Sequence, residues 1–243
     1  MILGCPVDRL TVQDTMAWMA ESVARKRPAM MAVVNANKLH QMAANPELQA
    51  IVIAADLIVP EWAMVWAARR LKLPPVPHSG GLLIAQAFLP FAEKHGLRPF
   101  FLGAKPEVVA ALVARVRRDY PRLDIAGAHH GYLKDASTEA GAIEQIKAAA
   151  PDVLFVAMGS PAQERWINAH KAALSVPVSI GIGGSFDVLS GLKPDTPSWA
   201  RGRGLEWLYR LALDPRAYGR RYLVTNSWFV TRVLMARVTG RRS

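Results

Sequence analysis

Continuous apolar segments alternate along the chain with segments whose apolar residues recur every three or four positions. The continuous segments predict strands that are buried on both faces, as in a parallel sheet. They are Met30–Asn35, Pro99–Gly103, Leu123–Gly127, Val153–Met158 and Val178–Gly183. Because helical segments separate these strands, the pattern predicts an α/β fold in which helices cover both faces of one sheet.

The helical periodicity is clearest from Pro106 to Asp119, where valines and a leucine share one side and Pro106 suits the first turn. Further helices are predicted at Val12–Ala24, Leu39–Ala44, Pro46–Ala54, Met64–Leu71, Thr138–Ala149 and Pro161–Ala173. Beyond Pro197 the chain becomes aromatic and arginine-rich, with helices expected at Leu205–Leu213 and Pro215–Val238. We therefore divide the chain into a domain of residues 1–197 and a C-terminal basic helical appendage of residues 198–243.

The net charge of +11 is concentrated in this appendage. From residue 201 to 243 there are ten arginines against two acidic residues, a net charge of +8. Such a block attracts nucleic acid, anionic lipid or a phosphorylated ligand, and charge alone does not choose among them.

Other whole-chain features point to a cytoplasmic protein. The single cysteine, Cys5, cannot form an internal disulfide, and we interpret it as a buried or idle thiol. The N-terminus lacks the pattern of a signal peptide, and apolar runs such as Leu82–Ala92 are shorter than the roughly 20 residues that cross a bilayer.

Several predicted strands end in small or polar residues that open into a helix. These loops are Asn35–Asn37, Gly103–Pro106, Gly159–Glu164 and Gly181–Asp187. In an open parallel sheet, ligands bind beyond the carboxyl ends of the strands, where helix N-termini offer N–H groups to anions. The loops therefore fit a nucleotide-binding cleft, although tight turns alone also explain the glycines. No dinucleotide fingerprint, Walker A loop or metal-ligand spacing is present.

Candidate chemistry lies beside these loops. Glu61 follows an apolar run and precedes Trp62, so its carboxylate fits a general base in an apolar setting; an ordinary helix-starting glutamate fits the same position. Gln163 and Glu164 offer an amide and a carboxylate to sugar or ribose hydroxyls, or serve only as helix N-terminal residues.

The order of these segments resembles the WecG/TagA/CpsF family of glycosyltransferases from about Met31 to Phe229. The matching blocks are Asn35-Ala-Asn37-Lys-Leu, Asn45-Pro-Glu-Leu, Ala55-Asp56-Leu57-Ile-Val-Pro60, Val65-Trp66-Ala-Ala-Arg69, Phe100-Phe-Leu-Gly103, Tyr120-Pro121, Gly131-Tyr132, Gly159-Ser-Pro161-Ala-Gln163-Glu164-Arg-Trp166, Gly181-Ile-Gly-Gly-Ser-Phe-Asp187 and Gly204-Leu-Glu-Trp207-Leu-Tyr-Arg210. So many blocks in one order do not agree by chance.

The resemblance implies a Rossmann-like transferase that inverts at the anomeric carbon, uses a UDP-sugar and needs neither metal nor cofactor. Donors in the family are usually N-acetylmannosamine or its uronic acid, and some relatives transfer glucose. Acceptors are sugars on a polyprenyl diphosphate, used to build teichoic acids or other surface polysaccharides. The implied location is the inner face of the plasma membrane, with the enzyme bound peripherally.

The resemblance also implies roles for individual residues. Glu61 occupies the column of the proposed base, an Asp in the family's Pro-Asp-Gly, and Asn35 joins it as a catalytic residue. Donor binding is carried over to Gly103, Tyr132, Gly159, Gln163, Glu164, Gly183, Gly184 and Asp187. Diphosphate binding is carried over to Arg210, Arg220 and Arg221, since arginine binds phosphate oxygens bidentately and stabilises charge on the leaving UDP.

Departures from the family leave the donor sugar open. Val33 stands where many members have Thr, and His78-Ser79-Gly80-Gly81 replaces the usual Gly-x-Asp. Asn37, His78 and Ser79 are the predicted acceptor or sugar contacts, so a hexose other than N-acetylmannosamine fits as well.

The last predicted helix mixes apolar residues with arginines, as expected for a helix in the headgroup layer of an anionic membrane. Two alternatives remain: a non-catalytic UDP-sugar-binding scaffold, and a protein that binds nucleic acid through the arginines, although no signature of the second is present. We expect no nucleic-acid partner. The oligomeric state is not fixed, and a homo-oligomer stays open.

Overall fold

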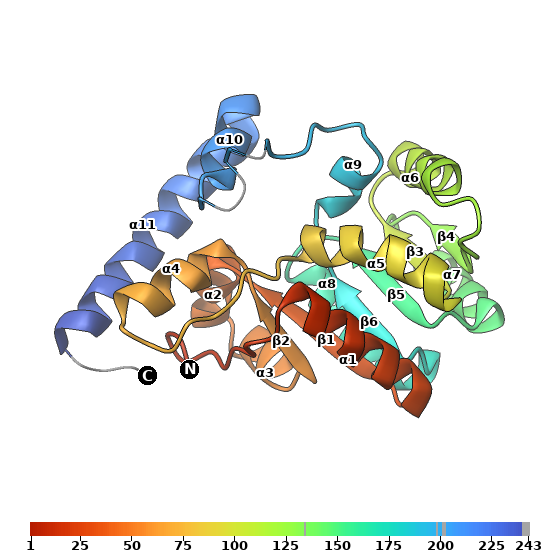
Figure 1. The fold of residues 1–243 in the computed structure, drawn as a ribbon, viewed down its shortest axis with the longest axis horizontal. Coiled ribbons are helices and arrows are strands. Elements are labelled where there is room, and N and C mark those ends of the chain that lie inside the picture. The colour runs from red at the N-terminus through yellow and green to blue at the C-terminus, as the bar shows by residue number, and fades with distance from the viewer. Residues whose placement is uncertain (134, 198, 201–202, 240–243) are drawn as a thin grey trace.

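A computed structural model describes residues 1–133, 135–197, 199–200 and 203–239. Within this part, six strands form one sheet with the order β2-β1-β6-β5-β3-β4, and every pair is parallel (Figure 1). The strands are β1 (Ala29–Val34), β2 (Leu57–Pro60), β3 (Pro99–Gly103), β4 (Gly127–His129), β5 (Val153–Ala157) and β6 (Val178–Gly181). The predicted α/β class with a parallel sheet is confirmed.

Helices connect the strands and form the C-terminal part of the described chain. They are α1 (Val12–Arg25), α2 (Ala36–Ala44), α3 (Pro46–Ile53), α4 (Trp62–Arg70), α5 (Gly81–His95), α6 (Pro106–Asp119), α7 (Ala136–Ala149), α8 (Ala162–Leu174), α9 (Ser185–Leu189), α10 (Glu206–Leu213) and α11 (Pro215–Thr239). Among the described helices, none combines the length and apolarity needed to cross a bilayer.

The two faces of the sheet build separate apolar cores. Successive residues of a strand point to opposite faces, so Met31 and Val33 pack with α1, α5, α6 and α9, while Ala32 and Val34 pack with α2, α3, α4 and α11. On the second face, β3 and β5 contribute to a further cluster with α7 and α8. Burial on both faces explains why these strands are continuously apolar in sequence.

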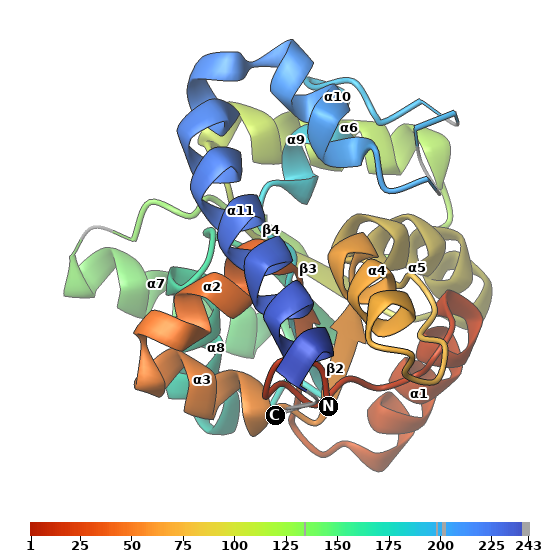
Figure 2. The ribbon, with the colours of Figure 1, turned by 90° about the vertical axis from the view of Figure 1, so that its left-hand side faces the viewer.

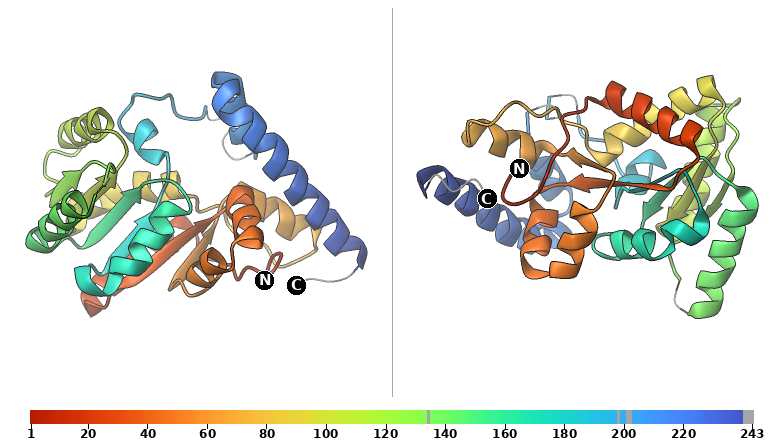
Figure 3. Two further views of the ribbon diagram at one scale, coloured as in Figure 1. Left: turned by 180° about the vertical axis from the view of Figure 1, so that it is seen from behind. Right: turned by 90° about the horizontal axis from the view of Figure 1, so that it is seen from below.

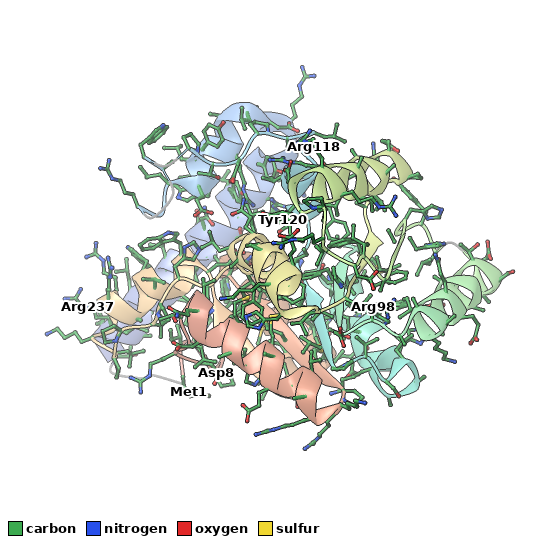
Figure 4. The ribbon with its side chains drawn as sticks, turned by 45° about the vertical axis from the view of Figure 1, so that its right-hand side comes forward. Met1, Asp8, Arg98, Arg118, Tyr120 and Arg237 are labelled. Carbon is green, nitrogen blue, oxygen red and sulfur yellow. The ribbon has the colours of Figure 1, made fainter. Side chains whose placement is uncertain are left out.

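Polar side chains close the amino-terminal edge of the sheet. Arg98, labelled in Figure 4, donates from Nη1 to the Ala149 carbonyl and from Nε to Asp124, and its backbone N–H donates to Asp152 Oδ2. Asp8, labelled in the same figure, accepts from the backbone N–H of Ile58 at 2.7 Å. These bonds satisfy backbone groups that would otherwise be left unpaired at strand starts.

Several sequence predictions need correction. The predicted strand at Leu123–Gly127 is wrong: β4 covers Gly127–His129, because residues 121–122 form a turn and Leu123 turns inward against the core. Position 127, where β4 begins, requires glycine because a Cβ there would lie 2.5 Å from the ring of Phe100 on β3. The predicted helix at Leu39–Ala44 begins three residues earlier, at Ala36, because Asn35 caps it.

Three elements were absent from the prediction. The apolar run at Leu57 forms β2, which four residues make too short to show a pattern of its own. Helix α5 carries Pro90 in its interior and is apolar on most sides, and α9 is only five residues long. Such segments give weak periodic signals because they are short or have apolar residues on most sides.

The C-terminal helix α11 is docked against the domain. It lies at the β2 end of the sheet, whereas β4 and α6 lie at the other end, as the rear and lower views show (Figure 3). Phe229, Val233 and Ala236 are buried in one cluster with residues of α2 and α4, and α11 runs across both helices (Figure 2). The division into two domains stays a prediction, since the appendage shares the core of residues 1–197.

Candidate functional site

The carboxyl ends of the parallel strands bring together loops that are distant in sequence. Strands β1 and β2 end beside Asn35 and Glu61, β5 ends before Gly159, and β6 ends before Gly183. The chain leaves β5 towards β6 and leaves β3 in the opposite direction towards β4, which creates a switch point between β3 and β5. Ligands of open parallel sheets bind in such a crevice.

Asn35 and Glu61 form the best defined polar contact at this edge. Asn35 caps α2, and its Oδ1 accepts a hydrogen bond from the backbone N–H of Lys38 at 2.9 Å. This bond turns the amide NH₂ outward, where Asn35 Nδ2 donates to Glu61 Oε2 at 2.9 Å. The two predicted catalytic residues are thus brought together across 26 residues of sequence.

The geometry leaves part of the Glu61 carboxylate available. Glu61 precedes α4, but its side chain makes no capping bond to that helix, and its backbone N–H donates to the Val34 carbonyl. One carboxylate oxygen is held by Asn35, while Oε1 accepts no hydrogen bond from the described residues. A half-buried carboxylate with one fixed and one open oxygen is suited to accept a proton from a ligand.

His78, Trp62 and Gly80 surround this carboxylate. The rings of His78 and Trp62 have centroids 5.4 Å apart, and a Cβ at Gly80 would lie 3.2 Å from both Glu61 Cγ and His78 Nε2. Burial lowers the pKa of His78, and the charge of Glu61 opposes this shift only in part. A neutral imidazole therefore stands beside the predicted base at neutral pH.

The neighbouring Ser79 is used within the protein. Its side chain is fully buried, its hydroxyl donates to the Leu10 carbonyl at 2.8 Å, and its backbone N–H donates to the Pro60 carbonyl. The structure therefore does not support the predicted sugar contact by Ser79. Asn37 is half-buried in the first turn of α2, and its predicted contact stays a prediction.

Arg210 on α10 lies within electrostatic range of Glu61. Burial by itself lowers the pKa of the Arg210 guanidinium, and the negative charge of Glu61 is the largest influence in the opposite direction. Smaller contributions in that direction come from Tyr222, Glu206 and Tyr218. The net result is a pKa above the ordinary value of arginine, so the docked appendage carries a fixed positive charge to the predicted base.

The other two arginines predicted to bind diphosphate are placed differently. Arg220 and Arg221 are exposed on α11. The Arg221 guanidinium lies over the rings of Tyr218 and Tyr222, at 4.8 Å and 5.1 Å from their centroids. These cation–π contacts orient Arg221, while contact with a diphosphate stays a prediction for both residues.

Glycines line the switch point between β3 and β5. Gly103 has a φ of 135°, and a Cβ there would lie 2.5 Å from the Ala157 carbonyl oxygen. Gly131 approaches so closely that its Cβ would lie 2.9 Å from the Gly103 Cα. Tyr132 follows with an exposed side chain, and Gly159 has a φ of 77°. These glycines carry no side chain, so a nucleotide can approach the backbone closely at this switch point.

Gln163 and Glu164 are buried and brace neighbouring loops. Gln163 Oε1 accepts from the backbone N–H of Gly183 at 2.9 Å, and its Nε2 donates to Glu164 Oε1 at 2.7 Å. Glu164 also binds Lys38 Nζ at 2.5 Å. The side chains were predicted to bind sugar or ribose hydroxyls, but they are 3% and 1% exposed. The structure thus directs both side chains to the protein interior, and a ligand contact is not supported for either.

Lys38 is the site residue that sequence reasoning missed. The sequence prediction began its helix at Leu39 and therefore left Lys38 in a loop. Its position three residues after Asn35 is the available signal, because it places the lysine in the first turn of a helix capped by that asparagine. The buried carboxylate that pairs with it is distant in sequence and shows no pattern.

The remaining predicted donor residues lie in the loop after β6. Gly183 has a φ of 54°, and Gly184 immediately precedes α9. Asp187 within α9 is half-buried, and its Oδ1 lies 3.4 Å from Lys193 Nζ. Donor binding by these residues stays a prediction.

A separate hollow of about 460 Å³ lies between α5, α6 and α9. It is lined by charged residues of both signs, including Arg115 with Asp119, which form an ion pair at 3.3 Å. It contains none of the predicted site residues. We place the functional site at the carboxyl edge of the sheet, where the Glu61 carboxylate and the glycines of the strand-end loops lie.

Comparison with known proteins identifies the family. A family model described as "Glycosyl transferase WecG/TagA/CpsF family" matches residues 1–243. Proteins named N-acetylglucosaminyldiphosphoundecaprenol N-acetyl-beta-D-mannosaminyltransferase are similar to this chain. The protein from Bacillus spizizenii is 36% identical over 191 residues, which is 78% of this chain and 72% of the relative. The Bacillus subtilis protein is 41% identical over 140 residues, 58% of this chain and 54% of the relative.

A protein of the same name from Staphylococcus aureus strain NCTC 8325 is 33% identical over 230 residues, which is 90% of this chain and 86% of the relative. Together with the family match over the whole chain, this similarity accounts for the shared order of strand-end loops. The chain belongs to the WecG/TagA/CpsF family and is a glycosyltransferase.

Proposed function

We propose that this enzyme transfers a hexose or N-acetylhexosamine from a UDP-sugar to a sugar on a polyprenyl diphosphate, with inversion at the anomeric carbon. The observation that carries the proposal is the Asn35–Glu61 contact at the carboxyl edge, with Arg210 in electrostatic range. The names of the relatives describe transfer of N-acetylmannosamine to a diphosphoundecaprenol-linked N-acetylglucosamine, which supports this class of acceptor.

The proposed chemistry uses the open oxygen of Glu61. Glu61 Oε1 takes the proton of the acceptor hydroxyl while Asn35 holds the other carboxylate oxygen. The acceptor oxygen forms a bond to the anomeric carbon, and the bond from that carbon to the UDP diphosphate breaks on the opposite face. The electron pair leaves with UDP, and the positive charge of Arg210 stabilises the diphosphate. Metal independence and the absence of a cofactor are part of this proposal.

The surroundings of the base leave the donor sugar open between an N-acetylmannosamine-type and a glucose-type donor. Val33 is 5% exposed and packs in the core beneath Gly81, so it offers no hydrogen bond. Trp62 and His78 add bulk beside the longer carboxylate of Glu61. We therefore infer that the donor sugar is selected partly by fit against these two rings.

The appendage supports membrane docking at the inner face of the plasma membrane. On α11, Leu223, Val224, Leu234 and Met235 are exposed, and α10 exposes further large apolar residues. Arg220 and Arg221 are exposed on the same helix. Exposed apolar side chains among arginines fit an anionic headgroup layer, where each basic group contributes about 1 kcal/mol of attraction.

The test is UDP release from a panel of UDP-hexoses and UDP-N-acetylhexosamines, with a polyprenyl-diphosphate-linked sugar as acceptor. We expect turnover of one donor, and a loss of roughly a hundredfold or more in kcat for Glu61→Gln, because the amide cannot accept the proton. Glu21→Gln, at an exposed site near the end of α1 that leads to the amino end of β1, is the matched control and keeps wild-type turnover.

Three results would contradict the proposal. Equal rates for wild type and Glu61→Gln would remove Glu61 from the mechanism. Tight UDP binding without turnover of any donor would instead indicate a non-catalytic scaffold, and binding to plain DNA in preference to anionic liposomes would indicate a nucleic-acid partner.

A further inference from the structure

A charged pair is buried directly behind the proposed base. Lys38 is 4% exposed and Glu164 is 1% exposed, and Lys38 Nζ lies 2.5 Å from Glu164 Oε1. Lysine and glutamate are almost never buried so completely unless they are paired. Even when paired, two buried charges commonly add little to stability, because the cost of removing them from water offsets their attraction.

The pair is not arranged to maximise stability. Glu164 Oε2 is buried and accepts no hydrogen bond from the described residues, so one half of the carboxylate is unsatisfied. A partly satisfied buried polar network is less stabilising than an apolar core of the same volume. A role in stability alone therefore does not account for the pair.

The pair joins two sides of the candidate site, because the backbone and the side chain of Lys38 each end in a hydrogen bond to a different side. On one side, the backbone N–H of Lys38 donates to Asn35 Oδ1, and Asn35 Nδ2 donates to Glu61. On the other side, Glu164 Oε1 accepts from Gln163 Nε2, and Gln163 Oε1 accepts from the backbone N–H of Gly183. The loops after β1, β2, β5 and β6 are thereby connected.

The position of Lys38 in the first turn of α2 explains how the Lys38–Glu164 pair acts on Asn35. Helix α2 has nine residues, and its buried apolar residues are Ala36 in the first turn and Leu39 and Met42 further along. The first turn carries Asn35 as its cap, and Lys38 is the side chain that ties this turn to α8. Without that tie, the first turn keeps the buried Ala36 and the Asn35–Glu61 hydrogen bond but loses its polar link to α8, so the amide that orients Glu61 is held less firmly.

We propose that Lys38 and Glu164 are positioning residues that set Glu61 against the donor-side loop through Asn35. This inference rests on the proposed function, because it assigns the pair to the orientation of the proposed base. Neither side chain reaches the cleft, so neither is expected to contact the substrate. A displacement of the base by about 1 Å is enough to lower turnover by up to about a hundredfold.

The experiment removes both charges together. Lys38→Met alone leaves a buried carboxylate without its partner and is expected to fold poorly. The double variant Lys38→Met/Glu164→Gln avoids this, and the new amide oxygen still accepts from Gln163 Nε2. The matched control is Arg165→Met/Glu47→Gln, which removes an exposed ion pair of 2.8 Å between α8 and α3.

We expect the double variant to lose roughly tenfold or more in kcat, with the donor KM within about threefold of wild type. Hydrogen exchange of residues 35–39 should become faster, because the first turn of α2 loses its tie to α8. The melting temperature should stay close to that of wild type, and the control variant should change none of these quantities.

An unchanged kcat in a folded double variant would overturn the inference. So would a parallel loss of kcat, donor affinity and melting temperature, which is the signature of general destabilisation. If the wild-type enzyme turns over no donor, the proposed function has failed, and hydrogen exchange decides the inference by itself. Unchanged exchange of residues 35–39 in the double variant would then refute the positioning role.

Discussion

Replacement of Phe229 by alanine should release the C-terminal helix from the domain. Phe229 is 3% exposed, and its ring lies 5.9 Å from that of Trp66 on α4, measured between centroids. Val233 and Ala236 are the other buried apolar residues in the described part of α11, and Trp228 is half-buried against the same cluster. Phe229 is the aromatic side chain that is fully buried in this contact.

The expected size of the effect follows from burial. Truncation of a buried Phe to Ala costs about 3–5 kcal/mol, and each 1.4 kcal/mol changes an equilibrium about tenfold. The undocked population should therefore rise a hundredfold or more. Arg210 on α10 would move away from Glu61 together with α11, since the two helices pack against each other. Turnover should fall in proportion to the docked fraction that is lost.

Limited trypsin digestion measures this population directly. When opening and closing are fast, cleavage follows the equilibrium fraction of the open form, and α11 supplies arginines as cleavage sites. Val230→Ala, at the neighbouring exposed position, is the control and should cleave at the wild-type rate. A Phe229→Ala variant that is cleaved as slowly as the control, and keeps full turnover, would refute the docking argument.

Three further predictions concern single side chains. Burial lowers the folded-state pKa of His78 below 6.5, so the unfolded chain takes up the extra proton more readily, and the free energy of unfolding falls as the pH drops below that value. His78→Gln should remove this loss. If the difference in unfolding free energy between the two proteins, measured in urea, is the same at about pH 7.5 and about pH 5.5, the prediction is contradicted. Burial raises the pKa of the Cys5 thiol to about 12, against smaller opposing effects of Lys38 and the N-terminus. Ellman's reagent should therefore react with Cys5 only after unfolding. Full labelling of the native protein would contradict this prediction, because it would show the thiol to be accessible. Leu223 is 73% exposed on α11, so Leu223→Asp should weaken sedimentation with anionic liposomes, whereas Ile53→Asp on α3 should not. Equal sedimentation of both variants and wild type would show that this part of α11 does not contact the membrane surface.

Sequence reasoning located the strand-end loops well because a parallel sheet leaves a direct signal. Strands buried on both faces are continuously apolar, so β1, β3, β5 and β6 were found to within a residue or two. Strand β4 was misplaced because the apolar residues before it belong to a packed turn. The remaining misses, β2, α5 and α9, are short or apolar all round and lack a clear period.

For the candidate site too, the sequence predicted some features and missed others. Glu61 and Asn35 were chosen from sequence by their place in the resembling blocks, and the structure joins them by a hydrogen bond. Gln163, Glu164 and Ser79 were also chosen, but the structure directs their side chains into the protein. Residue type at a strand end predicts that a loop belongs to the site, but it does not predict which way a side chain points.

The sequence by itself determined the alternation of strands and helices, the polar ends of the strands and the basic appendage. These features depend on local periodicity, spacing and charge, which are visible in residues that are neighbours in the sequence. Only the tertiary structure decided that Lys38 pairs with Glu164, that the charge of Glu61 acts on Arg210, and that α11 docks on α2 and α4. These contacts join residues far apart in sequence, so they depend on the order of strands in the sheet and on how the helices pack around it.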